Sequence, residues 1–279
     1  MGWLAVATIF AMPNNTLTVV IPVFNEIDLI ERCLTAVLKQ DEVDEVIVVD
    51  NNSSDGTPEM VAEYARRDGR LRQIHEVQQG VIPARNAGLN AATGELIARI
   101  DADSIVSVGW AARIKEFFTD HPEFDVLTGG AFTSDRKEFP TFRLLMKMLS
   151  RGEMPEFSET RGLQGSNMAF RRSAWENVRD DLHDDPDIWE DGDMSIGFIV
   201  KGHRMAWVND LEVEISNRRL MTNWRSYCEY TAQLPRTLRV NGWNREARLI
   251  WINVAWRRLD YVLYRVLYHR KASTGRALP

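Results

Sequence analysis

A short buried strand that runs into two acidic residues is predicted by the stretch Gly94-Glu95-Leu96-Ile97-Ala98-Arg99-Ile100-Asp101-Ala102-Asp103-Ser104. Because Asp101 and Asp103 follow the end of the strand, both carboxylates can reach the loop side of the sheet edge. Carboxylate oxygens suit a divalent cation that must also hold phosphate oxygens. An Asp-x-Asp spacing is common in acidic proteins, so a cation site here depends on support from the rest of the chain.

Strands and helices alternate in the residues that lead up to this stretch. Apolar and β-branched runs predict strands over Leu17–Val23, Val46–Val49, Arg70–Val77 and Glu95–Ile100. Helices are predicted between them, over Ile30–Leu38, from Thr57-Pro58 onward and over Pro83–Ala92. This alternation favours a parallel, doubly wound α/β sheet.

Polar side chains follow these predicted strands, at Asn25-Glu26, Asp50, Gln79-Gly80 and Asp101–Asp103. In such sheets, ligands bind beyond the carboxyl ends of the strands. One acid at one strand end is usually a helix cap, and Asn25 is expected to cap the helix that follows it. Four polar clusters at successive ends exceed what capping needs. We therefore expect a ligand cleft at this edge of the sheet.

The second half of the chain is less regular. Strands are expected over Val126–Gly130, Gly165–Phe170, Met205–Asn209 and Glu212–Ser216. Helices are expected over Phe139–Ser150, Ser173–Val178 and Asp187–Lys201, with a polar loop over Arg151–Leu163. Beyond Thr222 the pattern is helical to about residue 270. No linker rich in Pro, Gly or Ser separates the halves, so we expect one domain with a helical tail.

Composition suits a single large α/β domain, because the 279 residues are 44% hydrophobic and 27% charged. Cys33 and Cys228 form no metal-ligand spacing or disulfide framework, which favours the reducing cytoplasm. The apolar run Trp3–Met12 is too short for a membrane span and has no basic residue before it. We expect residues 1–16 to be a leader and the protein to be soluble or peripheral.

Charge is unevenly distributed along the chain. Residues 217–279 contain 13 Lys+Arg and 3 Asp+Glu, a net charge of +10. Because the whole chain has a net charge of −6, residues 1–216 have a net charge of −16. A basic tail suits an anionic surface, such as membrane phospholipid at the inner face, or nucleotide phosphate. Nucleic acid is not an expected partner, because the acidic body would repel it. Four tail tryptophans support membrane contact: Trp224, Trp243, Trp251 and Trp256.

An alternative for the tail is packing. Arg248, Arg257 and Arg265 are spread around a helical wheel and do not share one polar stripe. This favours helices that pack back on the domain or form a homodimer.

Five motifs stand in the order seen in family 2 glycosyltransferases, and the chain resembles that family from about Leu17 to Asn217. The motifs are Thr18–Glu26, Val48–Thr57, Ala84–Gly88, Asp101–Asp103 and Trp189–Asp193. The resemblance implies a GT-A type α/β fold, with a Rossmann-like, mixed, mostly parallel sheet flanked by helices. It implies a domain over residues 17–216, with a nucleotide half to about 104 and an acceptor half from 105, followed by a basic helical tail over 217–279.

The resemblance also implies a function, the inverting transfer of a sugar from a nucleotide-diphospho-sugar, most often a UDP-sugar. The donor would be bound by Pro22, Val23, Asn25, Glu26, Asp50, Arg85 and Asp101. In this set Asp50 would accept a hydrogen bond from the base, Arg85 would hold the nucleotide, and Asp101 would face the ribose or sugar. Asp103 would ligate Mn²⁺ or Mg²⁺. From the residues alone, a surface ion pair is the alternative for Arg85, and Asp55 is interpreted as a turn residue.

On the acceptor side, Asp191 stands at the family's catalytic-base position, and a carboxylate suits deprotonation of an acceptor hydroxyl. The acceptor would be bound by Gly165, Ser166, Asn167, Trp189 and Glu190. Asp193 is expected to have a supporting role. The acceptor itself is expected to be a glycan of the cell envelope or a lipid-linked glycan.

Three departures from the family pattern qualify this hypothesis. Asn51 replaces the usual second acid after Asp50, which should matter little because the first acid carries the contact. No His stands near Ser216, so the metal's third protein ligand is open, and Arg218-Arg219 can neutralise phosphate instead. The Gln-x-x-Arg-Trp motif of processive synthases is absent, which favours transfer of a single sugar.

Two other functions remain as alternatives. A nucleotidyltransferase of similar fold also needs acids and a metal beside a nucleotide. It normally has a Gly-rich phosphate loop near the first strand, and Pro22-Val23-Phe24-Asn25 is not such a loop. A non-catalytic nucleotide-sugar-binding protein is disfavoured by the intact Asp101, Asp103 and Asp191.

Overall fold

The computed structural model describes residues 15–133, 155–216, 218 and 222–273. Its centre is one sheet with the strand order β3-β2-β1-β4-β8-β6-β9-β5, and β7 also pairs with β9. The strands are β1 (Leu17–Val23), β2 (Glu45–Asp50), β3 (Leu71–His75), β4 (Leu96–Arg99), β5 (Ile105–Val106), β6 (Val126–Thr133), β7 (Phe157–Glu159), β8 (Met168–Arg171) and β9 (Met205–Ile215). The first four are mutually parallel, whereas β8 runs antiparallel to both β4 and β6.

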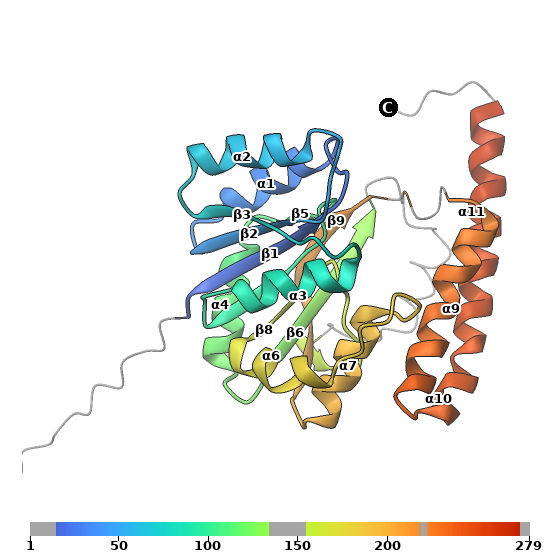
Figure 1. Ribbon diagram of the computed structural model, residues 1–279. Coiled ribbons are helices and arrows are strands. Elements are labelled where there is room, and N and C mark those ends of the chain that lie inside the picture. Colours follow the sequence, from blue (N-terminus) through green and yellow to red (C-terminus); the bar gives the residue numbers. More distant parts are fainter. Residues whose placement is uncertain (1–14, 134–154, 217, 219–221, 274–279) are drawn as a thin grey trace, which may run out of the picture.

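Helices cover both faces of the sheet (Figure 1). They are α1 (Ile30–Leu38), α2 (Thr57–Arg67), α3 (Val81–Ala91), α4 (Trp110–Asp120), α6 (Arg172–Val178) and α7 (Glu190–Val200). Strand β1 shows why two layers are needed: Val19 and Ile21 join one buried cluster, and Val20 joins the other. A strand that is buried on both faces is largely apolar, as β1 is apart from Thr18.

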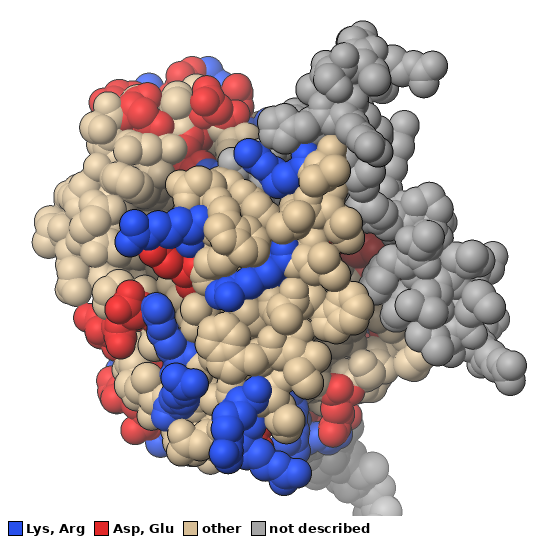
Figure 2. Space-filling model, turned by 90° about the vertical axis from the view of Figure 1, so that its right-hand side faces the viewer, with Lys and Arg blue, Asp and Glu red and all other residues tan. Residues whose placement is uncertain are grey.

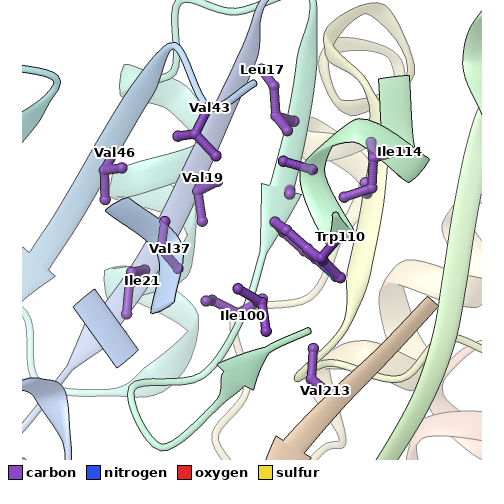
Figure 3. Close-up of a cluster of buried hydrophobic side chains, with 14 of the residues drawn as sticks. Leu17, Val19, Ile21, Val37, Val43, Val46, Ile100, Trp110, Ile114 and Val213 are labelled. Atoms are coloured by element: carbon purple, nitrogen blue, oxygen red, sulfur yellow. The ribbon is translucent and has the colours of Figure 1, made fainter. Parts of the chain in front are cut away.

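The larger buried cluster lies between the sheet and the helices α1, α2 and α4 (Figure 3). Trp110 is 1% exposed and fills the space between α4 and the strands (Figure 3). The smaller cluster packs α3, α6 and α7 on the opposite face, with Trp175 buried in it. Together these layers confirm the expected mixed α/β sheet flanked by helices.

The tail consists of α9 (Trp224–Val240), α10 (Asn244–Leu249) and α11 (Trp251–Ser273), which lie beside α7 (Figure 1). A third small apolar cluster joins the tail to the domain, with Ile196 of α7 packed on Leu238 and Ala247. In the described part of the chain, no helix is long and apolar enough to cross a membrane.

Several local predictions were wrong, each for a tertiary reason. Asn25 does not cap a helix: it has φ of 53°, its side chain accepts a hydrogen bond from the Ser54 amide at 2.8 Å, and α1 begins only at Ile30. The strand expected over Gly165–Phe170 is only β8, because residues 165–167 lie in a turn before it.

Other boundaries also differ. The two late strands expected around residue 210 are one strand, β9. Its pairing with β6 shifts in register, since Gly129 pairs with Val208 and Gly130 with Glu212, and β9 continues through this shift. The polar loop expected before Leu163 contains the short strand β7, and α4 was not expected. The helix expected over Phe139–Ser150 and most of the leader lie outside the described residues.

Candidate active site

The parallel register of the first strands gathers the predicted donor-binding residues at one edge of the sheet. Val23 at the end of β1 pairs with Asp50 at the end of β2, and Val20 pairs with Arg99 on β4. Asp101 and Asp103 follow β4 at the same edge. The structure therefore brings the ends of β1, β2 and β4 together, as the sequence predicts.

Arg99 is the centre of the site, although it is only 3% exposed and lies within a strand. Its Nη2 lies 2.8 Å from Asp101 Oδ1 and 3.3 Å from Glu190 Oε1, and its Nη1 lies 3.2 Å from Asp191 Oδ1. Burial acts to lower the pKa of Arg99, but the surrounding carboxylates outweigh it and raise the pKa. One charged guanidinium thus joins the end of β4 to the start of α7.

Sequence reasoning did not identify Arg99. The available signal is a single cation inside the otherwise apolar run Leu96–Ile100. A buried charge requires partners, so this position predicted acids nearby. It could not predict that two of them would come from α7, about ninety residues later in the chain.

Asp191 lies in the first turn of α7 and is 8% exposed. Burial raises its pKa to about 8, and the negative charges of Glu190 and Asp101 add to this effect. The positive charges of Arg99 and Arg85 act in the opposite direction. The carboxylate consequently binds a proton more tightly than an exposed aspartate does, which suits it to act as a base near neutral pH.

Arg85 of α3 lies beneath this group. It is 1% exposed, so the alternative of a surface ion pair is wrong. Its Nε and Nη2 donate to Asn86 Oδ1, and its Nη1 donates to the Glu190 carbonyl at 3.4 Å. Burial lowers its pKa. In this position Arg85 supports the start of α7, and direct contact with a nucleotide stays a prediction.

Asp103 is held on the late-strand side of the site. Ser216 Oγ donates to Asp103 Oδ2 at 2.5 Å, and Arg218 Nε lies 3.4 Å from the same oxygen. The other arm of Arg218 reaches Glu26 Oε2 at 2.6 Å. Arg218 therefore bridges two of the predicted donor-side acids.

The described residues contain no cluster of three or more His, Cys, Asp or Glu side chains that could hold a metal ion. Asp101 and Asp103 still offer hard oxygen ligands, and the Asp101 side chain is 40% exposed. Such a donor set fits Mn²⁺ or Mg²⁺ only if further oxygens come from elsewhere, since these cations require several ligands.

Asp50 and Asn51, at the end of β2, have different hydrogen-bond partners. Asp50 is 4% exposed, accepts a hydrogen bond from the Ser53 amide, and lies 3.3 Å from His75 Nδ1. The Asn51 side chain donates to two backbone carbonyls of the loop after β3 and accepts from the Gly80 amide at 2.8 Å. Asn51 thus fixes that loop. Asp55 accepts from the Thr57 amide and hydroxyl, which confirms that it is a turn residue.

The predicted acceptor residues fall into two groups. Asn167 is fully buried, accepts from Trp110 Nε1 at 2.9 Å and donates to the Leu211 carbonyl at 2.8 Å, so its amide supports the frame. Ser166 is 3% exposed and lies in the same turn. Trp189 and Glu190 instead border the site, with the Arg257 guanidinium 5.0 Å from the centre of the Trp189 ring.

Asp193 has the supporting role expected of it. It is 2% exposed and accepts hydrogen bonds from the His183 amide at 2.8 Å and from Asn241 Nδ2 at 2.8 Å. It therefore anchors the loop before α7 and the end of α9. The tail's predicted contact with a membrane and the predicted homodimer stay predictions.

Gly165 packs directly against the Arg99–Asp191 pair. A Cβ at this position would lie 2.0 Å from Asp191 Oδ2 and 2.2 Å from Arg99 Nη1, closer than real contacts allow. Only a glycine lets the backbone pass this close to the carboxylate.

We expect Gly165→Ala to displace Asp191 and to lower kcat/KM, for the sugar transfer that the resemblance implies, by about 10²-fold, the cost of a shift of about 1 Å at a reacting group. Gly69→Ala is the matched control, because a Cβ there also meets nothing within 4 Å and Gly69 lies in the exposed turn between α2 and β3. Steady-state kinetics on the two variants, with circular dichroism to check folding, makes the measurement. Equal activities would show that the close approach of Gly165 has no bearing on the site.

Comparison with known proteins agrees with this geometry. Residues 18–179, more than half of the chain, match the sequence model of the family described as Glycosyl transferase family 2. An uncharacterized glycosyltransferase, EpsJ of Bacillus subtilis (strain 168), is 32% identical over 143 residues, which cover 50% of this chain and 41% of EpsJ. The chain thus spans less than half the length of that relative.

Two solved structures are similar to the whole domain. The mannosyltransferase PcManGT from Pyrobaculum calidifontis, solved in complex with GDP-Man and Mn²⁺, has a TM-score of 0.64 at 20% identity and covers 94% of this chain and 76% of its own. The S. aureus protein TarS 1-349 in complex with UDP-GlcNAc has a TM-score of 0.59 at 18% identity and covers 80% of this chain and 66% of its own. At these identities the likeness shows the fold alone, and it confirms the expected GT-A type.

Proposed function

This chain belongs to glycosyl transferase family 2, and on that premise we propose that it transfers a single sugar from a nucleotide-diphospho-sugar to an acceptor hydroxyl, with inversion at the anomeric carbon. The observation that carries the proposal is the bridge made by Arg99. Its buried guanidinium contacts both Asp101 at the predicted donor side and Asp191 at the predicted acceptor side. Single displacement requires such proximity, because the base takes the proton of the acceptor hydroxyl while the hydroxyl oxygen attacks the anomeric carbon of the donor.

Asp191 is the proposed base. Inverting transfer needs one group that takes the proton of the acceptor hydroxyl as its oxygen attacks the anomeric carbon. Arg99 donates to one oxygen of Asp191, and the Gly165 backbone packs against the other, so the carboxylate is held in a fixed position. The raised pKa of Asp191 supports this role, because a stronger base takes the hydroxyl proton more readily.

The donor is proposed to bind at the edge formed by β1, β2 and β4. Asp50 would accept from the nucleotide base, and Asp101 would face the ribose or sugar. Asp103 would hold Mn²⁺ or Mg²⁺ together with oxygens of the donor diphosphate. When bound, that cation offsets the negative charge that develops on the leaving nucleotide. Arg218, next to Asp103, is placed to pair with the same phosphates.

We expect nucleotide binding to depend on a divalent cation and on Asp103. Calorimetry should detect UDP or GDP in the presence of Mn²⁺ and much weaker binding with EDTA. Asp103→Asn should weaken the cation-dependent binding by at least about tenfold, since even outer partners of a bound metal contribute about that much. Asp120→Asn, at the exposed end of α4, is the matched control.

The same assay discriminates between the alternatives. Failure to bind any nucleoside diphosphate would contradict this proposal. Hydrolysis of a panel of nucleotide sugars then identifies the donor, because a transferase without its acceptor slowly transfers the sugar to water and releases the nucleoside diphosphate. Release of inorganic diphosphate from a nucleoside triphosphate would instead indicate a nucleotidyltransferase.

A further inference from the structure

A cleft of about 710 Å³ lies between the start of α7 and the tail helices. We name it the tail cleft, and its walls include Asp191, Leu234, Leu238, Trp243 and Ile250. Its volume falls within the range of about 300–1,000 Å³ that is typical of small-molecule sites. The proposed catalytic base thus lines the tail cleft, together with residues 161–163, the start of α7 and the helices α9, α10 and α11.

The lining of the tail cleft is mostly apolar. Three tryptophans line it, Trp189, Trp243 and Trp256, together with leucine and isoleucine side chains of the tail. Its polar side chains are few: Arg161, Asp191, Ser195, Glu246 and Asn253. Ser195 is already engaged in hydrogen bonds within the protein. Ser195 Oγ donates to the Asp191 carbonyl at 2.6 Å and accepts from the Leu163 amide at 3.0 Å.

A polyhydroxylated chain would be poorly matched to this lining. Each buried hydroxyl that lacks a hydrogen-bond partner costs free energy, and the inner part of the tail cleft provides few partners. A hydrocarbon chain gains free energy in the same place through burial of its surface. The lining therefore favours an apolar occupant.

We propose that the tail cleft binds the hydrocarbon part of an amphiphilic acceptor, whose reacting hydroxyl lies at Asp191. This inference rests on the proposed function, because Asp191 must contact the acceptor oxygen if it is the base. Anything that extends from that oxygen into the tail cleft belongs to the acceptor. An acceptor of this class carries its apolar chain within about one sugar unit of the hydroxyl that attacks.

The mouth of the tail cleft continues as an apolar stripe on α11. Ile252 and Trp256, which line the mouth, are 65% and 68% exposed. Leu259, Leu263 and Val266 follow at intervals of three and four residues and are also exposed. Figure 2 shows that face of the molecule, where Lys and Arg side chains surround a largely uncharged area. A hydrocarbon chain longer than the tail cleft can continue along this stripe.

We expect the full-length protein to bind alkyl β-glucosides more tightly as the chain lengthens. Calorimetry below the critical micelle concentration should give a Kd that falls by about two- to fourfold per added methylene from butyl to octyl. Methyl β-glucoside should show no comparable binding. A Kd that does not change with chain length would overturn the inference.

Two exposed positions on one helix provide matched variants. Trp256→Ser removes a wall of the tail cleft and should weaken octyl β-glucoside binding by about tenfold or more. Leu263→Ser removes an exposed apolar side chain farther along α11, outside the tail cleft, and should leave the Kd unchanged. An equal loss in both variants would mean that the whole stripe adsorbs hydrocarbon, as a membrane-facing surface does, and would overturn a specific acceptor site.

The nucleotide calorimetry above separates the two levels of inference. If UDP or GDP binds with Mn²⁺ but alkyl glucosides show no dependence on chain length, the proposed function stands and the acceptor inference fails. If alkyl glucosides bind in the tail cleft but no nucleoside diphosphate binds, the tail cleft is a hydrophobic site of another kind, and the inference of an acceptor fails with the proposed function.

Discussion

Replacing Asp191 with Asn should abolish sugar transfer and leave donor binding intact. The amide cannot accept the proton of the acceptor hydroxyl, and loss of a general base costs about 10²–10⁴ in rate. The substitution keeps the size of the side chain, so the contact with Arg99 Nη1 can persist through the amide oxygen. Donor binding should therefore survive, because the proposed donor residues lie at the ends of β1, β2 and β4 and on α3, and none of them is changed.

The stability of the Asp191→Asn variant should not fall at pH 8. Burial raises the pKa of Asp191 to about 8 from an ordinary value of 3.8, so the folded protein holds a proton that the unfolded chain releases. The stabilising contribution of the protonated form is complete below about pH 4 and is lost as the pH rises through about 8. An Asn side chain does not ionise, so the variant avoids the free-energy cost of burying an ionised carboxylate, which the wild type has at high pH.

The measurement is a pH profile of kcat/KM with calorimetry of nucleotide binding. In the wild type, kcat/KM should rise with pH and level off above about 8, since the base must be deprotonated. The control is Asp180→Asn, the same change at a side chain that is 91% exposed in the same acidic run. Normal turnover by Asp191→Asn would contradict the assignment of Asp191 as the catalytic base.

Replacing Arg99 with Met should destabilise the fold more than any other single change proposed for this protein. Asp101, Glu190 and Asp191 would lose their shared cation, and two of them are largely buried. Removal of one partner from a buried ion pair costs about 3–5 kcal/mol, because the remaining charge is left uncompensated. Urea unfolding measures the loss.

Arg32→Met is the matched control on the same protein. The Arg32 side chain is 64% exposed and makes one ion pair of 3.7 Å with Glu214. A pair of this kind contributes about 0–1 kcal/mol. Similar urea midpoints for Arg99→Met and Arg32→Met would contradict the central role of Arg99.

Arg99→Lys tests whether Arg99 also positions Asp191. An ammonium keeps the charge but cannot reproduce the planar fork that reaches carboxylates on both sides. The pKa of Asp191 should then rise, because the opposing positive charge is less well placed, and the acid limb of the kcat/KM profile should move to higher pH. An unchanged profile in this folded variant would limit Arg99 to stability.

The sequence by itself determined the order of the elements and much of the donor side. Apolar runs and caps are local features, and they located β1, β2, β4 and α3 to within a few residues. The parallel arrangement then followed from alternation, because parallel strands need helical crossovers between them. Once β1, β2 and β4 are parallel, Asp50 and Asp101 must share an edge with the loop that follows β1.

Only the tertiary structure decided how the two halves meet. Arg99 and Asp191 are 92 residues apart in sequence, and no local pattern pairs them. Asn167 was predicted to bind the acceptor, yet its side chain is buried, because it forms hydrogen bonds with Trp110 and with the Leu211 carbonyl. The tail cleft likewise exists only because α9–α11 fold back on α7. Local periodicity specifies which residues form each element, whereas long-range packing specifies which charges and cavities those elements enclose.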